Sequence, residues 1–401
     1  MKYFIWIIVY ISTSYASILQ NAIDEALPYS TIKLSNAIYN GNIIISKPLT
    51  IIGNKSTISG DNIGNVITIK SDEVTLKNLI ITNSGNRIET LDSAITLEKS
   101  NNCNIINCNI TNSLYGINLS ISNNNLIKDN NISSLENLPL QQKGGGLKIW
   151  YSNNNTISNN IIKDVKNNVI SFSKNTKFLY NSFFNNMFAL HFSNSQHINI
   201  KNNNFKYNSS AIVSMGSKNI DIIENNILSS KGAAGIAIVL GGGKNILVKD
   251  NIIKYNAKAF YIDSKFKEQG MQRYFINNNI SYNKEAFHFH RAIKNNTITH
   301  NKIIANISDI VKDTPNFLTA NNNIEYNYWD QYCGFDKNHD NIGDTPYKSY
   351  QYSDKLWHYN HSIKFFFASP ALSLINFLSQ IAPFIEPNLL LEDKKPIVKI
   401  R

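Results

Sequence analysis

The chain has 401 residues, 42% of them hydrophobic and only 17% charged, with a formal net charge of +11. The hydrophobic fraction is enough to form a core, and the length allows either two or three ordinary domains or one long array of repeats. The three cysteines, Cys103, Cys108 and Cys333, are odd in number and widely spaced, which excludes a disulfide framework and a Cys-x-x-Cys metal site.

Residues 1–16, MKYFIWIIVYISTSYA, have the pattern of a secretory signal peptide. Lys2 gives the positive start, an apolar run extends from Tyr3 to Ile11, and Ala16 ends a short stretch that fits a cleavage site. A membrane anchor is the alternative, but spanning a bilayer takes about 20 apolar residues. A basic chain could bind nucleic acid, an anionic membrane or an acidic protein. Because this one has an export signal, we expect no nucleic-acid partner.

The middle of the chain is built from repeats of about 22 residues. The segments NNTISNNII, NTKFLYNSF, INIKNNNF and IDIIENNI align on Ile161, Phe183, Phe205 and Ile227, and each step is 22 residues. The apolar residues alternate with a period of two, which indicates strands, and the density of asparagine disfavours helix. Two residues before the marker stands a recurrent asparagine: Asn130, Asn159, Asn181, Asn203, Asn225, Asn278, Asn301 and Asn322, with Cys108 and Asp250 as exceptions.

These repeats predict an all-β fold, a right-handed parallel β-helix of the pectate-lyase type, over residues 17–326. One coil cannot bury its own inner face, so coils must stack, and stacking places equivalent side chains about 4.8 Å apart. At that spacing one asparagine amide can bond to the next, which explains the recurrent residue. The stack leaves strand edges at both ends. The segment ILQNAIDEAL from Ile18 is expected to be an amphipathic helix that caps the first edge, with Leu19, Ala22, Ile23 and Ala26 facing the rod.

The outward positions of one strand set carry soft-metal donors. His191 and Met215 fall on neighbouring coils, offset by two residues, or roughly 8 Å between Cα atoms. Long His and Met side chains could meet there on a soft ion such as Cu(I). His288 and His290 form a second candidate pair on one strand, and Met187 and Met271 lie nearby in the sequence. The alternative is that these histidines simply face solvent.

Catalytic signatures are scarce. The sequence contains no Gly-x-Ser-x-Gly and no His-Glu-x-x-His motif. Many β-helices cleave polysaccharides, but a glycosidase needs two carboxyl groups flanking one bond. The outer face offers Asp263, with Arg273 or Arg291 as a partner, and no close acid pair. We therefore expect a protein that is not an enzyme, with a secreted carbohydrate-binding or polysaccharide-cleaving β-helix as the alternative.

After the repeats, residues 327–347, NYWDQYCGFDKNHDNIGDTPY, form an acidic loop. Counted from Asp336, oxygen donors stand at alternate positions, as in a calcium loop, with Ile342 offering its carbonyl. Position 6 lacks the usual glycine and position 12 lacks a glutamate. An Asx-rich turn without metal is therefore an equal alternative. The proposed calcium ligands are Asp336, Asn338, Asp340, Ile342 and Asp344.

The tail, residues 348–401, has few asparagines and much Phe and Leu. Ser369 and Pro370 have the pattern of a helix start, and Pro383 that of a helix end. An apolar stripe then predicts either a helix folded back on the rod or one that docks on a membrane partner. The rod is expected to stay folded without the residues after Ala368. The stripe consists of Leu374, Phe377, Leu378 and Ile381.

The chain resembles the NosD family along nearly its whole length. The specific resemblance lies in NYWDQYCGFDKNHDNIGDTPY, followed by Leu356-Trp357, the SPAL segment at Ser369 and PNLLLEDKKP at Pro387. The chain departs from the family pattern at Asn341, where glycine is usual, and at Cys333, where an acid is common. Both departures concern the calcium-like loop.

This resemblance implies a periplasmic accessory protein in the maturation of nitrous oxide reductase. It implies transient handling of copper(I) during assembly of the copper–sulfide cluster. The implied partners are the membrane and ATPase subunits of an ABC transporter, a copper-chaperone lipoprotein and the reductase apoprotein.

Overall fold

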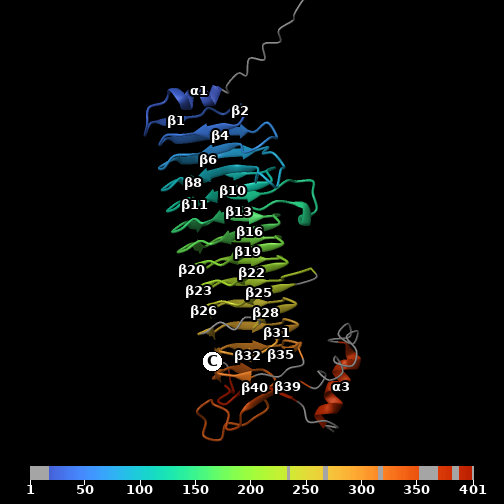
Figure 1. Cartoon of the computed structure of the whole chain (residues 1–401). Coiled ribbons are helices and arrows are strands. Elements are labelled where there is room, and N and C mark those ends of the chain that lie inside the picture. Colours follow the sequence, from blue (N-terminus) through green and yellow to red (C-terminus); the bar gives the residue numbers. More distant parts are fainter. Residues whose placement is uncertain are drawn as a thin grey trace, which may run out of the picture.

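A computed structural model describes residues 18–232, 235–264, 270–314, 319–351, 369–381 and 388–399. The chain forms a long rod, a right-handed parallel β-helix of about 13 turns, with α1 at one end and β39, β40 and α3 at the other (Figure 1). The predicted fold is therefore confirmed. The proposed signal peptide, residues 1–16, lies outside the described residues. Within them, no helix has the length and apolar character needed to cross a bilayer.

One face of the rod is a sheet of 12 parallel strands, here called the site sheet. Each coil contributes one strand to it, and the strands follow one another in chain order. They are β3 (Ile43–Ile45), β5 (Ile67–Ile69), β7 (Ser93–Glu98), β10 (Tyr115–Ser120), β13 (Leu147–Trp150), β16 (Asn167–Ser171), β19 (Phe188–Ser193), β22 (Ser210–Met215), β25 (Ile236–Gly241), β28 (Lys258–Asp263), β31 (Glu285–His290) and β35 (Ser308–Lys312).

The remaining faces are formed by a 24-stranded sheet to which most coils contribute two strands. Its strands are β1 (Thr31–Lys33), β2 (Ile38–Asn40), β4 (Thr50–Ser59), β6 (Thr75–Thr82), β8 (Asn104–Ile106), β9 (Asn109–Ile110), β11 (Leu126–Lys128), β12 (Asn131–Ser133), β14 (Thr156–Ser158), β15 (Ile161–Lys163), β17 (Lys177–Leu179), β18 (Ser182–Phe184), β20 (Gln196–Lys201), β21 (Asn204–Lys206), β23 (Lys218–Ile223), β24 (Asn226–Leu228), β26 (Lys244–Lys249), β27 (Ile252–Lys254), β29 (Arg273–Ile276), β30 (Asn279–Ser281), β33 (Asn296–Thr299), β34 (Lys302–Ile304), β37 (Asn323–Glu325) and β38 (Tyr328–Trp329).

The other elements are short. They comprise α1 (Ile18–Glu25), the 3-10 helix η1 (Leu140–Gln142), the pair β32 (Ile293–Lys294) and β36 (Thr319–Ala320), the antiparallel pair β39 (Tyr347–Gln351) and β40 (Asn388–Asp393), and α3 (Pro370–Ile381). Helix α1 caps the rod as predicted, because Leu19 and Ile23 are buried in the core and Ala26 packs against it. Ala22, the other residue of the predicted face, is exposed. The Gln20 side chain of α1 exchanges hydrogen bonds with the backbone of Ile44 on the exposed strand edge (2.8 and 3.1 Å).

The core follows from the alternation of apolar residues. In-register stacking places like on like, so Phe183 lies opposite Phe205 and their rings stack at 4.9 Å. A column of alanines runs along the site sheet, at the second residue of successive strands. Ala189, Ala211, Ala237, Ala259 and Ala286 fill it in successive coils, all fully buried. In the last coil Asp309 takes this position and is also buried.

A continuous asparagine ladder runs inside the rod. Each member donates from Nδ2 to Oδ1 of the next, at 2.9–3.0 Å, and the same oxygen accepts the backbone N–H of the donating asparagine. Every member is buried, so each amide must be satisfied inside the rod. The members are Asn130, Asn160, Asn181, Asn203, Asn225, Asn251, Asn278, Asn301 and Asn327.

Two predicted members of this ladder are wrong. Asn159 is exposed in the left-handed conformation (φ 55°), and the following Asn160 points inward instead. Asn322 belongs to a different column, in which it accepts from Asn296 (2.9 Å). Asp250 likewise precedes the true member, Asn251. At Asn159 and Asp250 the prediction takes the turn residue directly before the ladder residue. At Asn322 it takes the turn before β37 instead of the turn before β38, where the true member Asn327 stands.

The C-terminal end of the ladder is closed by the tail. Asp393 of β40 is fully buried and accepts from Asn327 Nδ2 (2.9 Å), from the Asn327 backbone (3.1 Å) and from Trp329 Nε1 (3.0 Å). A carboxylate accepts only, so it can end a column of donors that has no further coil. Leu390 and Leu391 join the core beside it. The end of the tail is therefore part of the rod, which argues against the expectation that the rod stays folded without the residues after Ala368.

Candidate functional site

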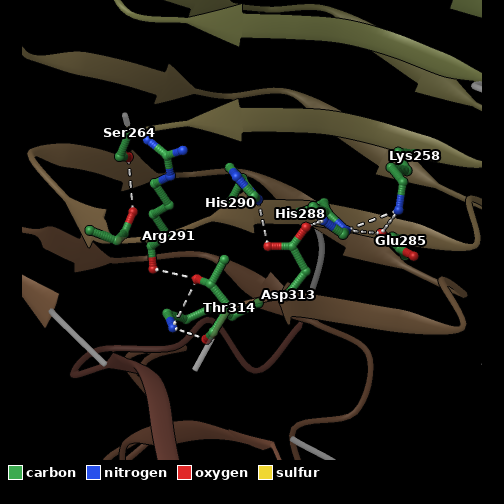
Figure 2. A network of polar contacts seen from close by, with 10 residues as sticks. Lys258, Ser264, Glu285, His288, His290, Arg291, Asp313 and Thr314 are labelled. Atoms are coloured by element: carbon green, nitrogen blue, oxygen red, sulfur yellow. Dashed lines mark hydrogen bonds and ion pairs between the residues drawn. The ribbon is translucent and has the colours of Figure 1, made fainter. Parts of the chain in front are cut away.

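A cluster of charged side chains occupies the outer face of the site sheet on its last three strands. The register places Lys258 of β28 opposite Glu285 of β31, and Tyr261 opposite His288. Alternation along each strand turns Tyr261 and His288 outward while Phe287 and Phe289 point into the core. Lys258 and Glu285 stand at the first positions of their strands, directly before the buried Ala259 and Ala286. Asp313 follows β35 directly. Figure 2 shows the cluster from close by, and we call Lys258, Glu285, His288, His290 and Asp313 the ion cluster.

The two carboxylates of the ion cluster hold the two histidines. His288 Nδ1 lies 2.5 Å from Glu285 Oε2, and its Nε2 lies 3.1 Å from Asp313 Oδ2. The other oxygen of Asp313 is 2.8 Å from His290 Nδ1. Lys258 Nζ donates to Glu285 Oε2 at 2.6 Å. Asp313 thus bridges both rings, and Glu285 joins His288 to the lysine (Figure 2).

The electrostatics match this pairing. Burial by itself would lower the pKa of His288, but the hydrogen bonds to Asp313 and Glu285 outweigh it and the pKa is raised. Burial would raise the pKa of Asp313, yet the hydrogen bond and charge of His288, with those of His290, lower it to about 2. Burial, with the charges of Asp313 and Asp263, raises the pKa of Tyr261 to about 12. The two carboxylates therefore favour the protonated form of His288, against the effect of burial and of Lys258.

The two histidines of the cluster differ in what their rings can still do. Both nitrogens of His288 are hydrogen-bonded to carboxylates, so this ring has no lone pair for a metal. His290 uses Nδ1 for Asp313, so its Nε2 lies on the side of the ring away from that carboxylate. A carboxylate on one ring nitrogen is the usual support for a histidine that binds metal through the other.

The predicted pair of His191 and Met215 does not come together. Met215 lies opposite Ser193, two residues along from His191, as the alignment predicts. Its side chain turns the other way, however, and lies over Gly241 on the following coil, where a Cβ would be 2.5 Å from Met215 Sδ. His191 stays half-buried beside the ring of Phe188 (6.0 Å), and burial lowers its pKa. The absence of a side chain at Gly241 explains the turn of Met215.

The two further methionines are also separated from the histidines. Met271 is buried, and its Sδ accepts from Arg273 Nη2 at 2.8 Å. Met187 is half-buried just before β19, four strands from β31 in the site sheet. In the described part of the chain, no group of three or more His, Cys, Asp and Glu side chains has the geometry to hold a metal ion. In the ion cluster this follows from its pairing, because donors and acceptors face each other rather than a shared centre.

The calcium-like loop uses its oxygens internally. Asp336 accepts from the backbone N–H of Asn341 (2.9 Å), and Asp344 accepts from that of Lys337 (2.7 Å). Asp340 accepts from the backbone N–H of Ile342 (2.8 Å), and Asn338 contacts the Asp340 side chain (3.0 Å). The bond from Ile342 to Asp340 is an Asx turn, and the other two backbone bonds tie more distant parts of the loop together; none of them needs a metal.

The residue that departs from the glycine pattern anchors this loop to the C-terminus. Asn341 adopts the left-handed conformation (φ 69°) that glycine usually supplies, which asparagine tolerates. Its side chain exchanges two hydrogen bonds with the backbone of Lys399, both at 2.9 Å.

Sequence reasoning missed Lys258, Glu285 and Asp313. A signal for Asp313 exists, because SDIVKD from Ser308 aligns under EAFHFH from Glu285 and places this aspartate in the column of His290. Glu285 and Lys258 carry no comparable signal. Lysine and glutamate are common on strand surfaces, and only the register shows that these two meet.

Residues 136–334 match the model of a family described as "Periplasmic copper-binding protein (NosD)". The chain belongs to the NosD family. The matched segment of this NosD protein contains the whole ion cluster, whereas α1, the first coils and α3 lie outside it. No curated protein matches the sequence.

Solved structures resemble this NosD protein in fold. A mannuronic acid specific family 6 polysaccharide lyase from human gut microbiota is 15% identical, covering 74% of this chain and 82% of its own, with a TM-score of 0.52. A polygalacturonase from Erwinia carotovora ssp. carotovora is 13% identical over 75% and 92% (TM-score 0.48). The Streptococcus pneumoniae surface adhesin PfbA is 16% identical over 80% and 91% (TM-score 0.46). At such identities the likeness concerns the fold alone.

Proposed function

We propose that this protein is a periplasmic accessory factor for copper-site assembly in nitrous oxide reductase, including its copper–sulfide cluster. Membership of the NosD family carries the proposal, since the family is described as periplasmic and copper-binding. The implied partners are an ABC transporter with membrane and ATPase subunits, a copper-chaperone lipoprotein and the reductase apoprotein. Copper is then cargo that the protein passes on.

We propose His290 as the copper contact of the ion cluster. Its Nδ1 is held by Asp313, so Nε2 is the nitrogen that can meet an incoming ion. Asp313 is in turn held by His288, which acts as a positioning residue. A single presented imidazole binds copper weakly unless a partner supplies further donors. That arrangement suits transfer between proteins better than storage.

The proposal is for a protein that is not an enzyme. The pairing of Asp263 with Arg273, considered for polysaccharide cleavage, is disfavoured by the position of Arg273. Its side chain is fully buried inside the rod, where Nη1 donates to Asn296 Oδ1 (3.2 Å) and Nη2 contacts Met271. A guanidinium at that place is not offered to a polymer on the outer face.

The tail supplies the proposed contact with the transporter. Helix α3 lies beside the C-terminal end of the rod (Figure 1). Its Leu374, Phe377 and Leu378 are 57%, 55% and 52% exposed. The side chain of Ile381, the fourth residue of the predicted stripe, is outside the described residues. An exposed apolar stripe of this kind fits a groove on a membrane subunit.

The experiment compares His290→Ala with His197→Ala, an exposed histidine on β20 that serves as the matched control. Each variant replaces the wild-type protein in cells that make the reductase, and the copper content of the purified reductase is measured. We expect His290→Ala to lower it severalfold and His197→Ala to leave it unchanged. X-ray absorption of the copper-loaded wild-type protein should show nitrogen ligation that the His290 variant lacks. Full copper loading in cells that lack this protein altogether would overturn the function.

A further inference from the structure

Four bulky apolar side chains gather at the edge of the site sheet on its fourth to sixth strands, β10, β13 and β16. Trp150, Tyr151, Phe172 and Ile121 are 40%, 48%, 43% and 42% exposed. Ile121, Tyr151 and Phe172 follow one another in the same turn of successive coils, because the N–H of each bonds to the last residue of the next strand. We call these four residues the aromatic edge.

The backbone beneath the aromatic edge is strained. Ile121, Tyr151 and Phe172 all adopt left-handed conformations, with φ of 52°, 46° and 52°. This region favours glycine and asparagine, and a β-branched residue there is a clear outlier. In the next coil the same turn position holds Asn194, which fits it well (φ 50°). Three consecutive bulky residues therefore stand where asparagine would be the more stable choice.

The rings of the aromatic edge have small neighbours and pack on one another. The residues opposite Trp150 in the neighbouring strands are Ser120 and Ser171, so space is left on both sides of the indole. Tyr151 and Phe172 stack on each other at 4.9 Å, and Trp150 meets Tyr151 edge to face at 4.7 Å. Tryptophan and tyrosine in such a setting are the residue types that dominate protein–protein binding energy.

The rim of the aromatic edge is basic. Lys99 precedes Ile121 in the turn column, Lys174 follows Phe172 by two residues, and Lys148 lies on the same outward face as Trp150. The nearest carboxylate on that strand face, Glu98, is paired with Lys70 at 3.6 Å. The rim therefore offers positive charge that a partner could neutralise.

We propose that the aromatic edge is a docking site for a protein segment with an apolar or aromatic anchor flanked by carboxylates. The apolar rings take the anchor, and the three lysines select the flanking acids by charge complementarity. This inference does not depend on the role of copper. The aromatic edge lies six strands from the ion cluster in the site sheet, about 29 Å along the rod.

The ring arrangement favours a protein over a glycan or a lipid. A glycan would stack on several open ring faces, but Tyr151 has Phe172 on one side and Ile121 on the other in its column, which leaves Trp150 as the main open ring. A bilayer would need a wider apolar surface than this one, which is bounded in its own turn column by Lys99 and Asn194. The apolar side chains of a protein segment can pack against the ring edges, which requires neither open ring faces nor a wide apolar surface.

The test begins with random peptides displayed on phage and selected on the full-length protein. We expect the enriched peptides to combine an aromatic or aliphatic residue with flanking Asp and Glu. Their affinities are then measured by fluorescence anisotropy on Tyr151→Asn/Phe172→Asn, which copies the asparagine already present at position 194. Loss of a hot spot should weaken binding about thirtyfold. The control is Tyr180→Asn, an exposed tyrosine with the same left-handed backbone (φ 56°) in a different turn column.

Stability separates docking from a structural role. Because asparagine relieves backbone strain while the ring stack is lost, the double variant should melt within about 3 °C of the wild type. Reversing Lys99 and Lys174 to glutamate should weaken binding about tenfold, with no effect from Lys177→Glu. A large fall in melting temperature, peptides without the acidic and apolar signature, or equal binding by the control and test variants would each overturn the proposal. So would preferential binding of oligosaccharides or anionic vesicles at this edge.

Discussion

Two columns of side chains run along this rod and differ in almost every respect. Inside, asparagine recurs from Asn130 to Asn327, and each member makes the same bonds. Outside, the column on the site sheet reads Ser120, Trp150, Ser171, Ser193, Met215, Gly241, Asp263 and His290. A buried amide must be satisfied in every coil, so the interior repeats. The outer face has water as an alternative partner, so it can vary and carry function.

The largest loss of stability is expected at the C-terminal end of the asparagine ladder, where one aspartate replaces the repeated amide. Asp393→Ala removes the one acceptor shared by Asn327 and Trp329 and leaves three buried donors unpaired. We expect unfolding in urea to show a loss of about 3–5 kcal/mol. Glu392→Ala next to it, whose carboxylate is 4.0 Å from the Lys348 amine at the surface, should cost less than about 1 kcal/mol. Similar losses in the two variants would remove the special role of Asp393.

A second test concerns the position where the interior column changes from alanine to aspartate. Burial and the charge of Asp330 raise the pKa of Asp309 to about 7, against about 3.9 in an unfolded chain. The folded protein keeps a proton there that the unfolded chain releases. Stability is therefore full below about pH 4 and declines as the pH rises through 7, by about 2–4 kcal/mol.

The change that checks this decline is Asp309→Asn, which stays neutral and keeps a group able to meet Tyr347. Urea unfolding at pH 5 and pH 8 should show a smaller pH dependence than the wild type and a more stable variant at pH 8. The exposed Asp61→Asn provides the control and should follow the wild-type profile. An unaltered decline in the Asp309 variant would mean that another group is responsible.

The smallest expected effect comes from the middle of the ladder. Asn203→Leu should destabilise the rod by roughly 1–3 kcal/mol, because Asn181 loses the acceptor of two bonds and Asn225 loses a donor. Asn204→Leu changes the next residue, which is exposed on β21, and should stay within about 0.5 kcal/mol. Equal melting curves for both variants and the wild type would show that the ladder does not hold the coils together.

The sequence is sufficient for the fold because the interior repeats. The 22-residue steps from Phe183 to Phe205 and Ile227 correctly predict stacked coils. The first marker is one residue out of register, because Ile161 is exposed and the buried Ile162 pairs with Phe183. The sequence is less reliable about register within asparagine runs, as Asn159 and Asn160 show, because turn and ladder positions accept the same residue. It also fails at the tail, since Asp393 acts 66 residues away from Asn327 and no repeat links them.

The candidate site could be predicted only in part. His288 and His290 stand out as an alternating pair, and both lie in the ion cluster. The side chain of Met215 turns away from His191 because it can lie over Gly241 in a third coil, and an alignment of two coils does not reveal this. Glu285 and Asp313 decide how many ring nitrogens of His288 and His290 are hydrogen-bonded to carboxylates. Those two acids are recognisable only once the strands are in register.

The direction of the ladder has a consequence for how such a protein can change in length. Every asparagine donates toward the C-terminus and accepts from the coil before it, so an added coil fits anywhere between Cys108 and Asp393. Only the two ends are unique. The length of the rod can therefore change in steps of one coil, each about 4.8 Å. Duplicating one coil between β16 and β28 would move the aromatic edge and the ion cluster apart by about 4.8 Å and leave both intact.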